Sequence, residues 1–123
     1  MAGTLTYEDN KPNSKAAIGS VVISWTGTAG GAVSGNSVPF NGRIERVVTN
    51  PTDGPTANYD ITLDDADGLD LAQGLLANRH TTNSEEVTPL IGTYHLVPYR
   101  GLITPTVANS GSSKSGTITI YYS

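Results

Sequence analysis

The chain has 123 residues, a length typical of one domain, and it carries a formal net charge of -4 with an isoelectric point near 4.8. It has no cysteine, which excludes disulfides, zinc–thiolate sites, iron–sulfur clusters and thiol catalysis. Its seven basic residues are spread along the sequence without the clustering that phosphate neutralisation requires, so we expect no nucleic-acid partner.

Residues 1–16 are polar and show no sustained periodicity. We interpret them as an N-terminal arm or a loosely held first strand that lies outside the core. A short strand is predicted within this segment, because Thr and Tyr favour extended backbone. Its residues are Thr4, Leu5, Thr6 and Tyr7. The sequence starts without the basic and apolar segments of a signal peptide and has no run of about 20 apolar residues. We therefore expect neither export by that route nor a membrane span.

The first clear strand is predicted over residues 17–26. Val21, Ile23 and Trp25 fall on one face of this segment, and polar residues fall on the other, as in a strand with one buried face. Trp25 is the single tryptophan, and its neighbours on that face are aliphatic. We interpret it as a core anchor and not as a platform on which a ligand stacks.

The next segment combines glycine-rich loops with turn signals. Residues 27–37 are rich in glycine and predict a flexible loop. The Asn41-Gly42 pair predicts a hairpin turn, because both residues tolerate positive φ, and residues 44–49 predict the strand that follows. Residues 50–56 combine proline, asparagine, aspartate and glycine, which predicts a turn.

A strictly alternating segment follows. Tyr59, Ile61 and Leu63 alternate with polar residues, so they predict a strand with one buried and one solvent-facing side. An acidic turn comes next, and carboxylates around a glycine are ligands that Ca²⁺ accepts. The glutamate that an EF-hand needs at its twelfth loop position is missing, and Asp and Gly also favour ordinary turns. The calcium candidates, which we rank below a plain turn, are Asp65, Asp67 and Asp70.

The second half of the chain holds the one segment that favours a helix. Residues 71–78 predict one or two helical turns, and residues 79–89 predict a polar, mobile loop. Residues 93–98 and 102–108 predict either two strands or one long strand with a break.

Residues 116–122 alternate strictly and predict a closing strand. Pro98 and Pro105 lack an N–H group, so we place both at a sheet edge or bulge. We therefore predict an all-β, antiparallel β-sandwich or jelly-roll-like domain over residues 17–123. It has six to eight short strands, long polar loops and at most one short helix.

Signals for catalysis are missing from the sequence. There is no G-x-S-x-G nucleophile motif, and His80 and His95 are the only histidines. Residues 111–117 have the composition of a phosphate loop but the wrong order, and they precede a predicted strand where a phosphate loop precedes a helix. We expect no enzyme activity and no cofactor.

Several blocks of sequence resemble a group of phage proteins. They are Gly-Asn-Ser-Val, Gly-Arg-Ile-Glu-Arg-Val-Val-Thr-Asn-Pro, Tyr-Asp-Ile-Thr-Leu-Asp-Asp-Ala-Asp-Gly-Leu-Asp and Gly-Thr-Ile-Thr-Ile-Tyr-Tyr. Over residues 17–122, this order resembles small tailed-bacteriophage virion proteins of the capsid decoration, or cement, type. The resemblance implies a structural protein that is assembled in the bacterial cytoplasm. It would lie on the outer capsid surface as a homotrimer, bind the major capsid protein and stabilise the shell.

Several alternatives stay open beside this interpretation. A phage tail or neck component would share the fold and the composition. A carbohydrate-binding or adhesin-like β-sandwich module would need exposed aromatic residues, which predicts a solvent-accessible Trp25. If the phage interpretation holds, the strand over residues 4–7 is the candidate interface, because an arm can add a strand to a capsid sheet. A disordered tail is the alternative for these residues.

Overall fold

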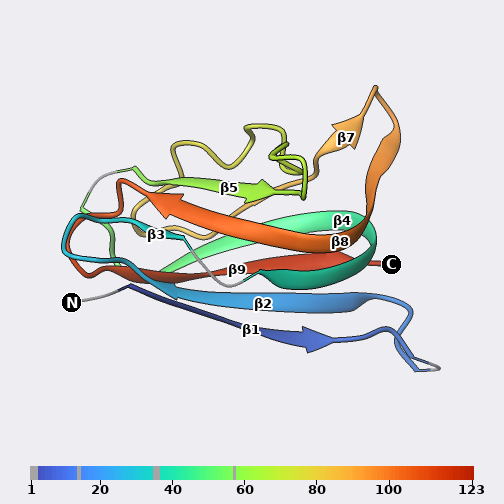
Figure 1. Ribbon diagram of the computed structural model, residues 1–123, viewed down its shortest axis with the longest axis horizontal. Helices are drawn as coiled ribbons and strands as arrows, with labels where there is room; N and C mark the ends of the chain where they lie inside the picture. The colour runs from blue at the N-terminus through green and yellow to red at the C-terminus, as the bar shows by residue number, and fades with distance from the viewer. Residues whose placement is uncertain (1–2, 14, 35–36, 57) are drawn as a thin grey trace.

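The computed structural model describes residues 3–13, 15–34, 37–56 and 58–123. In these residues it contains nine strands and no helix (Figure 1). The strands are β1 (Thr4–Asn10), β2 (Gly19–Thr26), β3 (Val33–Ser34), β4 (Val38–Asp53), β5 (Asp60–Asp64), β6 (Glu85–Val87), β7 (Leu90–Ile91), β8 (His95–Ala108) and β9 (Ser115–Tyr122). The predicted all-β class is confirmed, with one strand more than the upper limit of the prediction.

All strand pairs are antiparallel, and the sheet follows the order β1-β2-β9-β4-β8-β3. Strands β5 and β7 also pair with β8, and β6 pairs with β4. The first half of β4 pairs with β8 and its second half pairs with β9, so this strand passes from one layer to the other. The result is a curled sheet that folds over itself like an open half-barrel (Figure 1).

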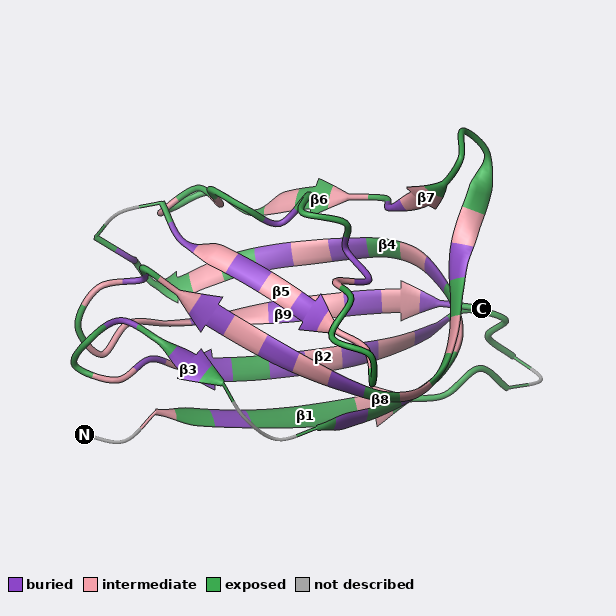
Figure 2. Cartoon of the chain, turned by 45° about the horizontal axis from the view of Figure 1, so that its top comes forward, coloured by how far each residue is buried: buried purple, intermediate pink, exposed green. Residues whose placement is uncertain are grey.

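The core lies between the two layers, where the alternating residues meet. In β2, β5 and β9, every second side chain is buried, which Figure 2 shows as a regular change of colour along each arrow. Trp25 is 2% exposed, and its ring lies 5.5 Å from the ring of Tyr59, centroid to centroid. The predicted buried faces of β2 and β5, the predicted alternation in β9 and the assignment of Trp25 to the core are confirmed.

The N-terminal segment is part of the sheet. Residues Thr4–Asn10 pair with β2 along their whole length, and Leu5 lies opposite Trp25 with only 4% of its surface exposed. The expectation that residues 1–16 lie outside the core is therefore wrong at Leu5. A single leucine among polar residues gives no periodic signal, although it is sufficient to anchor an end strand.

The Asn41-Gly42 pair does not form a hairpin, because strand β4 continues through it without a break. A side chain at Gly42 would place its Cβ 2.7 Å from the backbone oxygen of Ser123 and 2.8 Å from a ring carbon of Tyr122. The glycine thus allows the C-terminal residue to pack beside β4, where Arg43 and Ser123 exchange backbone hydrogen bonds. The turn predicted over residues 50–56 also begins later, since β4 continues to Asp53.

The helix predicted over residues 71–78 is also wrong. This segment forms successive turns, and Gln73 and Gly74 have φ angles of 57° and 77°, which a right-handed helix does not accept. It follows the outer edge of β5, where Leu71 donates a backbone hydrogen bond to Leu63. The segment therefore covers a sheet edge that would otherwise be open.

Two further segments differ from the expected loops. The loop expected over residues 79–89 contains β6, and the loop expected over residues 27–37 contains β3, although residues 35–36 lie outside the described part. Residues 95–108 form one long strand, which was one of the two predicted possibilities.

Candidate functional site

The four interface candidates of the N-terminal segment lie in β1. Thr4 and Thr6 point to the outer face of the sheet and are exposed, Leu5 is buried, and Tyr7 is exposed. Of the four, Leu5 is therefore unable to meet a partner while the sheet is intact. A role of Thr4, Thr6 and Tyr7 in binding a capsid stays a prediction.

The acidic turn uses its carboxylates to hold backbone amides. Asp65 Oδ1 accepts hydrogen bonds from the N–H groups of Asp67 and Leu69, both at 2.9 Å. Asp70 accepts bonds from Leu63 at 2.9 Å, from Ala72 at 3.0 Å and, through its other oxygen, from Gly74 at 2.9 Å. Among the described residues, no three acidic, histidine or cysteine side chains converge as a metal site. The calcium candidates Asp65, Asp67 and Asp70 are therefore not brought together.

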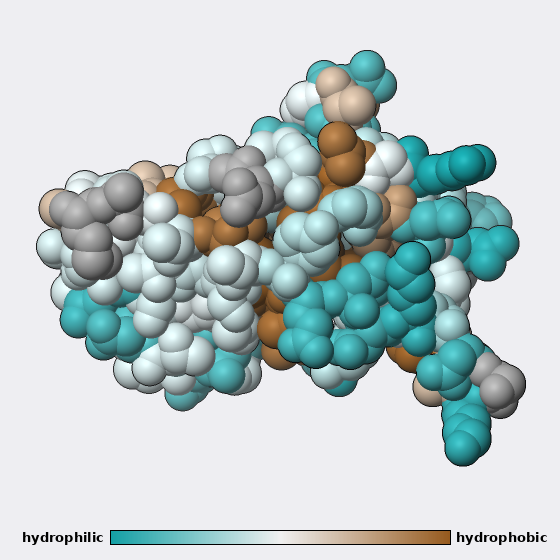
Figure 3. All heavy atoms as spheres, turned by 60° about the horizontal axis from the view of Figure 1, so that its bottom comes forward, coloured by the Kyte–Doolittle hydropathy of each residue, from teal (hydrophilic) through white to brown (hydrophobic). Residues whose placement is uncertain are grey.

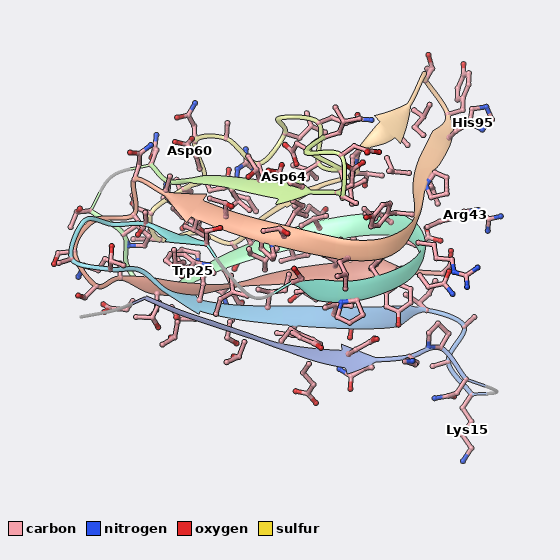
Figure 4. The ribbon with its side chains drawn as sticks, viewed as in Figure 1. Lys15, Trp25, Arg43, Asp60, Asp64 and His95 are labelled. Atoms are coloured by element: carbon pink, nitrogen blue, oxygen red, sulfur yellow. The ribbon has the colours of Figure 1, made fainter. Side chains whose placement is uncertain are left out.

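The two histidines lie in different surroundings. His80 Nδ1 is an acceptor for the backbone N–H groups of Thr82 at 3.0 Å and Asn83 at 2.9 Å, so its ring fixes a turn. His95 opens β8, is exposed and pairs with Ile91 across a hairpin (Figure 4).

This hairpin, formed by β7, residues 92–94 and the start of β8, is the first surface that the sequence did not reveal. It stands clear of the layered body (Figure 1). Tyr94 at its turn is 86% exposed, and Ile91 is 49% exposed. Aromatic residues are enriched at protein interfaces, so this pair is a candidate contact. The sequence carried no signal for it, because exposure of these two side chains depends on how far the hairpin projects.

The second such surface is an open groove of 610 Å³ at the end of the molecule where the chain terminates. We call it the end groove. Its main lining residues are Lys11, Pro39, Phe40, Arg100, Leu102 and Tyr122. Phe40 and Tyr122 form an aromatic floor, with ring centroids 5.1 Å apart in an edge-on arrangement. On the side of the molecule that carries β1, Figure 3 shows hydrophobic residues set between hydrophilic ones.

One acidic group of the groove already has a partner. The Tyr122 hydroxyl donates a hydrogen bond of 2.6 Å to Asp9 Oδ1. Burial, together with this hydrogen bond and the charge of the Asp9 carboxylate, raises the pKa of Tyr122 to about 12. The phenol is therefore a fixed, neutral part of the floor at physiological pH.

The basic residues near the groove have no such partners. Within the described residues, Lys11 and Arg100 form no ion pair, and neither does Arg43, which lines a neighbouring depression together with Arg100. The three basic residues elsewhere that do form ion pairs are Arg46 with Glu86, Arg79 with Glu85 and Lys114 with Asp53. The end groove thus has an apolar floor, and its lining combines the basic residues Lys11 and Arg100 with the Asp9 carboxylate.

The basic residues Lys11, Arg43 and Arg100 are far apart in the sequence. They meet only because the segment after β1, the start of β4, the middle of β8 and the C-terminus reach the same end of the sheet. No local spacing or motif could have indicated this.

Comparison with known proteins gives no relatives, since no family model, no curated protein and no solved structure matches this chain. The described residues contain no helix with the length and apolar character that crossing a membrane requires.

Proposed function

We propose that this protein is a non-enzymatic structural component of a tailed-bacteriophage virion, which binds the outer surface of the capsid and stabilises it. The observation that carries this function is the β7–β8 hairpin, where Tyr94 is 86% exposed on a segment that projects from the body (Figure 1). The resemblance of the sequence blocks to decoration proteins supports the choice of the capsid as the partner.

The hairpin has the properties of a protein-binding anchor. Tyrosine is over-represented among the residues that contribute most binding energy in protein interfaces. Ile91, which lies opposite His95 in the hairpin register, adds an exposed aliphatic side chain to the same hairpin. Gly92 has a φ of 65°, which glycine adopts without strain, so the turn that carries Tyr94 needs no strained backbone.

A carbohydrate-binding module is less well supported. The platform expected for such a module is Trp25, and this residue lies between the two layers with 2% of its surface exposed (Figure 4). A tail or neck component would use the same hairpin, so only the position in the particle separates it from a capsid protein.

Immunogold electron microscopy of the source virions tests the location. We expect gold over the head. Gold on the tail or neck would assign the protein there, and unlabelled intact particles would contradict a surface role.

Capsids that lack the protein then test the hairpin. We expect the double variant Tyr94→Ser, Ile91→Ser to bind these capsids at least about tenfold more weakly than the wild type, with an unchanged melting temperature. The matched control is Leu75→Ser, which changes another exposed aliphatic residue away from the hairpin. Full binding by the double variant would exclude the hairpin as the anchor.

A further inference from the structure

We infer, building on the function proposed above, that the end groove accepts an extended segment of the major capsid protein. This segment pairs as a strand with the open edge of β4 at Asn41, along the line of β9. The contact is separate from the β7–β8 hairpin, which carries the proposed function.

The hydrogen-bond ladder between β4 and β9 stops at the groove. Tyr122 of β9 pairs with Ile44 of β4, and Ser123 then exchanges two backbone hydrogen bonds with Arg43, of 2.9 Å and 3.0 Å. Among the described residues, the positions of β4 before Arg43 pair only with β8. The other side of this part of β4 is therefore an edge of the sheet.

The backbone of Asn41 is directed toward the groove, and Asn41 is one of the lining residues. The backbone polar groups of successive residues in a strand point to alternate sides, so those of Asn41 point the same way as those of Arg43. The register between β4 and β8 runs from Val38 to Ile44 without a shift, so no bulge interrupts this alternation. The N–H and C=O groups of Asn41 are therefore the next pair that a strand in the line of β9 can bind.

Pro39 marks the same edge of β4. A proline has no N–H group, and within sheets it is confined to edges and bulges, where no partner needs that donor. Pro39 precedes Asn41 by two residues, so its carbonyl points to the same side. The edge thus offers one donor and two acceptors, and this number suits a segment of about four extended residues, which spans about 13 Å.

The groove also defines the side chains that the segment should carry. The neighbours of the segment residue that faces Asn41 point inward, toward the aromatic floor of the groove. The charged residues of the lining are of both signs, namely Asp9, Lys11 and Arg100. The groove therefore favours an extended chain with apolar side chains facing inward, and not a chain of one charge. In this mode of recognition, main-chain hydrogen bonds give affinity and alternate side chains give specificity.

The position of the groove favours the capsid as the source of this segment. The hairpin that we propose as the capsid anchor and the C-terminus beside the groove lie at the same end of the molecule (Figure 1). Along the chain, Tyr94 of the hairpin precedes Arg100 of the groove by six residues, which is about 20 Å of extended strand. A capsid protein bound at the hairpin is therefore within reach of the groove.

Amide hydrogen exchange, measured by NMR on the free protein, tests the open edge. The N–H of Asn41 should exchange faster than those of Phe40 and Gly42, which point to β8. Equal protection of the three amides would mean that the edge of β4 is already covered, and it would overturn the inference.

Capsids that lack the protein test the strand pairing. Asn41→Pro removes the N–H that faces the groove and leaves the bonds to β8 in place, so capsid binding should weaken by at least about tenfold. The matched control is Asn41→Ala, which keeps the N–H and should bind like the wild type. A proline variant that folds and binds like the wild type would reject the inference.

A C-terminal extension tests the groove without any substitution in the fold. Four added residues, Val-Thr-Val-Thr after Ser123, continue the alternation of β9 and can pair with Asn41 in the same molecule. We expect this extension to raise the melting temperature and to weaken capsid binding, because it occupies the groove. The matched control, Gly-Pro-Gly-Pro, cannot pair as a strand and should change neither. Unchanged capsid binding with the alternating extension would overturn the inference.

Crosslinking identifies the source of the segment. The chain has no cysteine, so Asn41→Cys can carry a single photoactivatable crosslinker. On assembled particles it should link to one segment of the major capsid protein, whereas links only to other copies of this chain would overturn the inference. Binding that depends on the hairpin but not on Asn41 would reject the inference and keep the proposed function. A wild type that binds no capsid would reject the proposed function itself.

Discussion

Tyr122 connects the packing of the end groove to the pH dependence of stability. Its pKa is raised to about 12 in the folded protein, chiefly by burial and further by the Asp9 carboxylate, whereas in the unfolded chain a tyrosine titrates near about 10. Between these two values the folded state keeps a proton that the unfolded state has lost. Stability is therefore fully present below the unfolded pKa and falls as the pH rises through this window.

We expect the free energy of unfolding, measured with urea from pH 9 to pH 12, to fall with pH for the wild type and less steeply for Tyr122→Phe. Some slope should remain in the variant, because burial also raises the pKa of Tyr59. At neutral pH the variant should be less stable than the wild type, since it loses the hydrogen bond to Asp9. Equal slopes in the two proteins would contradict the assignment.

At the scale of the element, β1 depends on one side chain. Leu5 is buried opposite Trp25, whereas the other residues of this strand are exposed or only partly buried. We expect Leu5→Ala to lower the free energy of unfolding by about 2–4 kcal/mol, because it removes a buried aliphatic group and leaves a cavity. Thr6→Ala, on the outer face, should change it by less than about 0.5 kcal/mol. Urea denaturation followed by Trp25 fluorescence measures both.

A Leu5→Ala variant as stable as the wild type would mean that β1 is a dispensable arm. The stability of Leu5→Ala also determines how the capsid binding of a truncation that lacks residues 2–16 should be interpreted. Such a truncation removes a core residue together with the interface candidates, so its loss of capsid binding alone would not identify a contact.

The elements that the sequence predicted are those whose residues alternate without interruption. Tyr59, Ile61 and Leu63 form a buried face in β5, as expected, because each strand of this kind buries one side and no other conformation does so with period two. The hairpin predicted at Asn41-Gly42 was wrong because the packing of the C-terminus against Gly42 overrides the local turn preference. The helix predicted over residues 71–78 was wrong because this segment forms successive turns, and its apolar side chains cover the edge of β5.

At the scale of the whole molecule, neither candidate surface could be predicted from local sequence. The end groove joins four chain segments, which bring Lys11, Arg100 and Asp9 together although they are far apart in the sequence. The exposure of Tyr94 follows from the projection of the hairpin, which depends on β8 extending beyond the body. Both are consequences of the curled sheet and not of any motif.

The same architecture divides the molecule into a stable centre and a surface that opens easily. Strand β9 is paired on both sides, with β2 and β4, whereas β7 makes only two residue pairs with β8. Backbone amides exchange with solvent through local opening where few contacts hold them, and through global unfolding where many do. Hydrogen exchange followed by mass spectrometry should therefore show rapid exchange over residues 92–95 and the slowest exchange in β9.

Addition of capsids should slow exchange in the hairpin if this segment is the anchor. Protection of the free hairpin equal to that of β9 would contradict the division into stable and mobile parts. It would also mean that variants at Tyr94 and Ile91 alter the folded core, because a hairpin that opens only on global unfolding contributes to global stability.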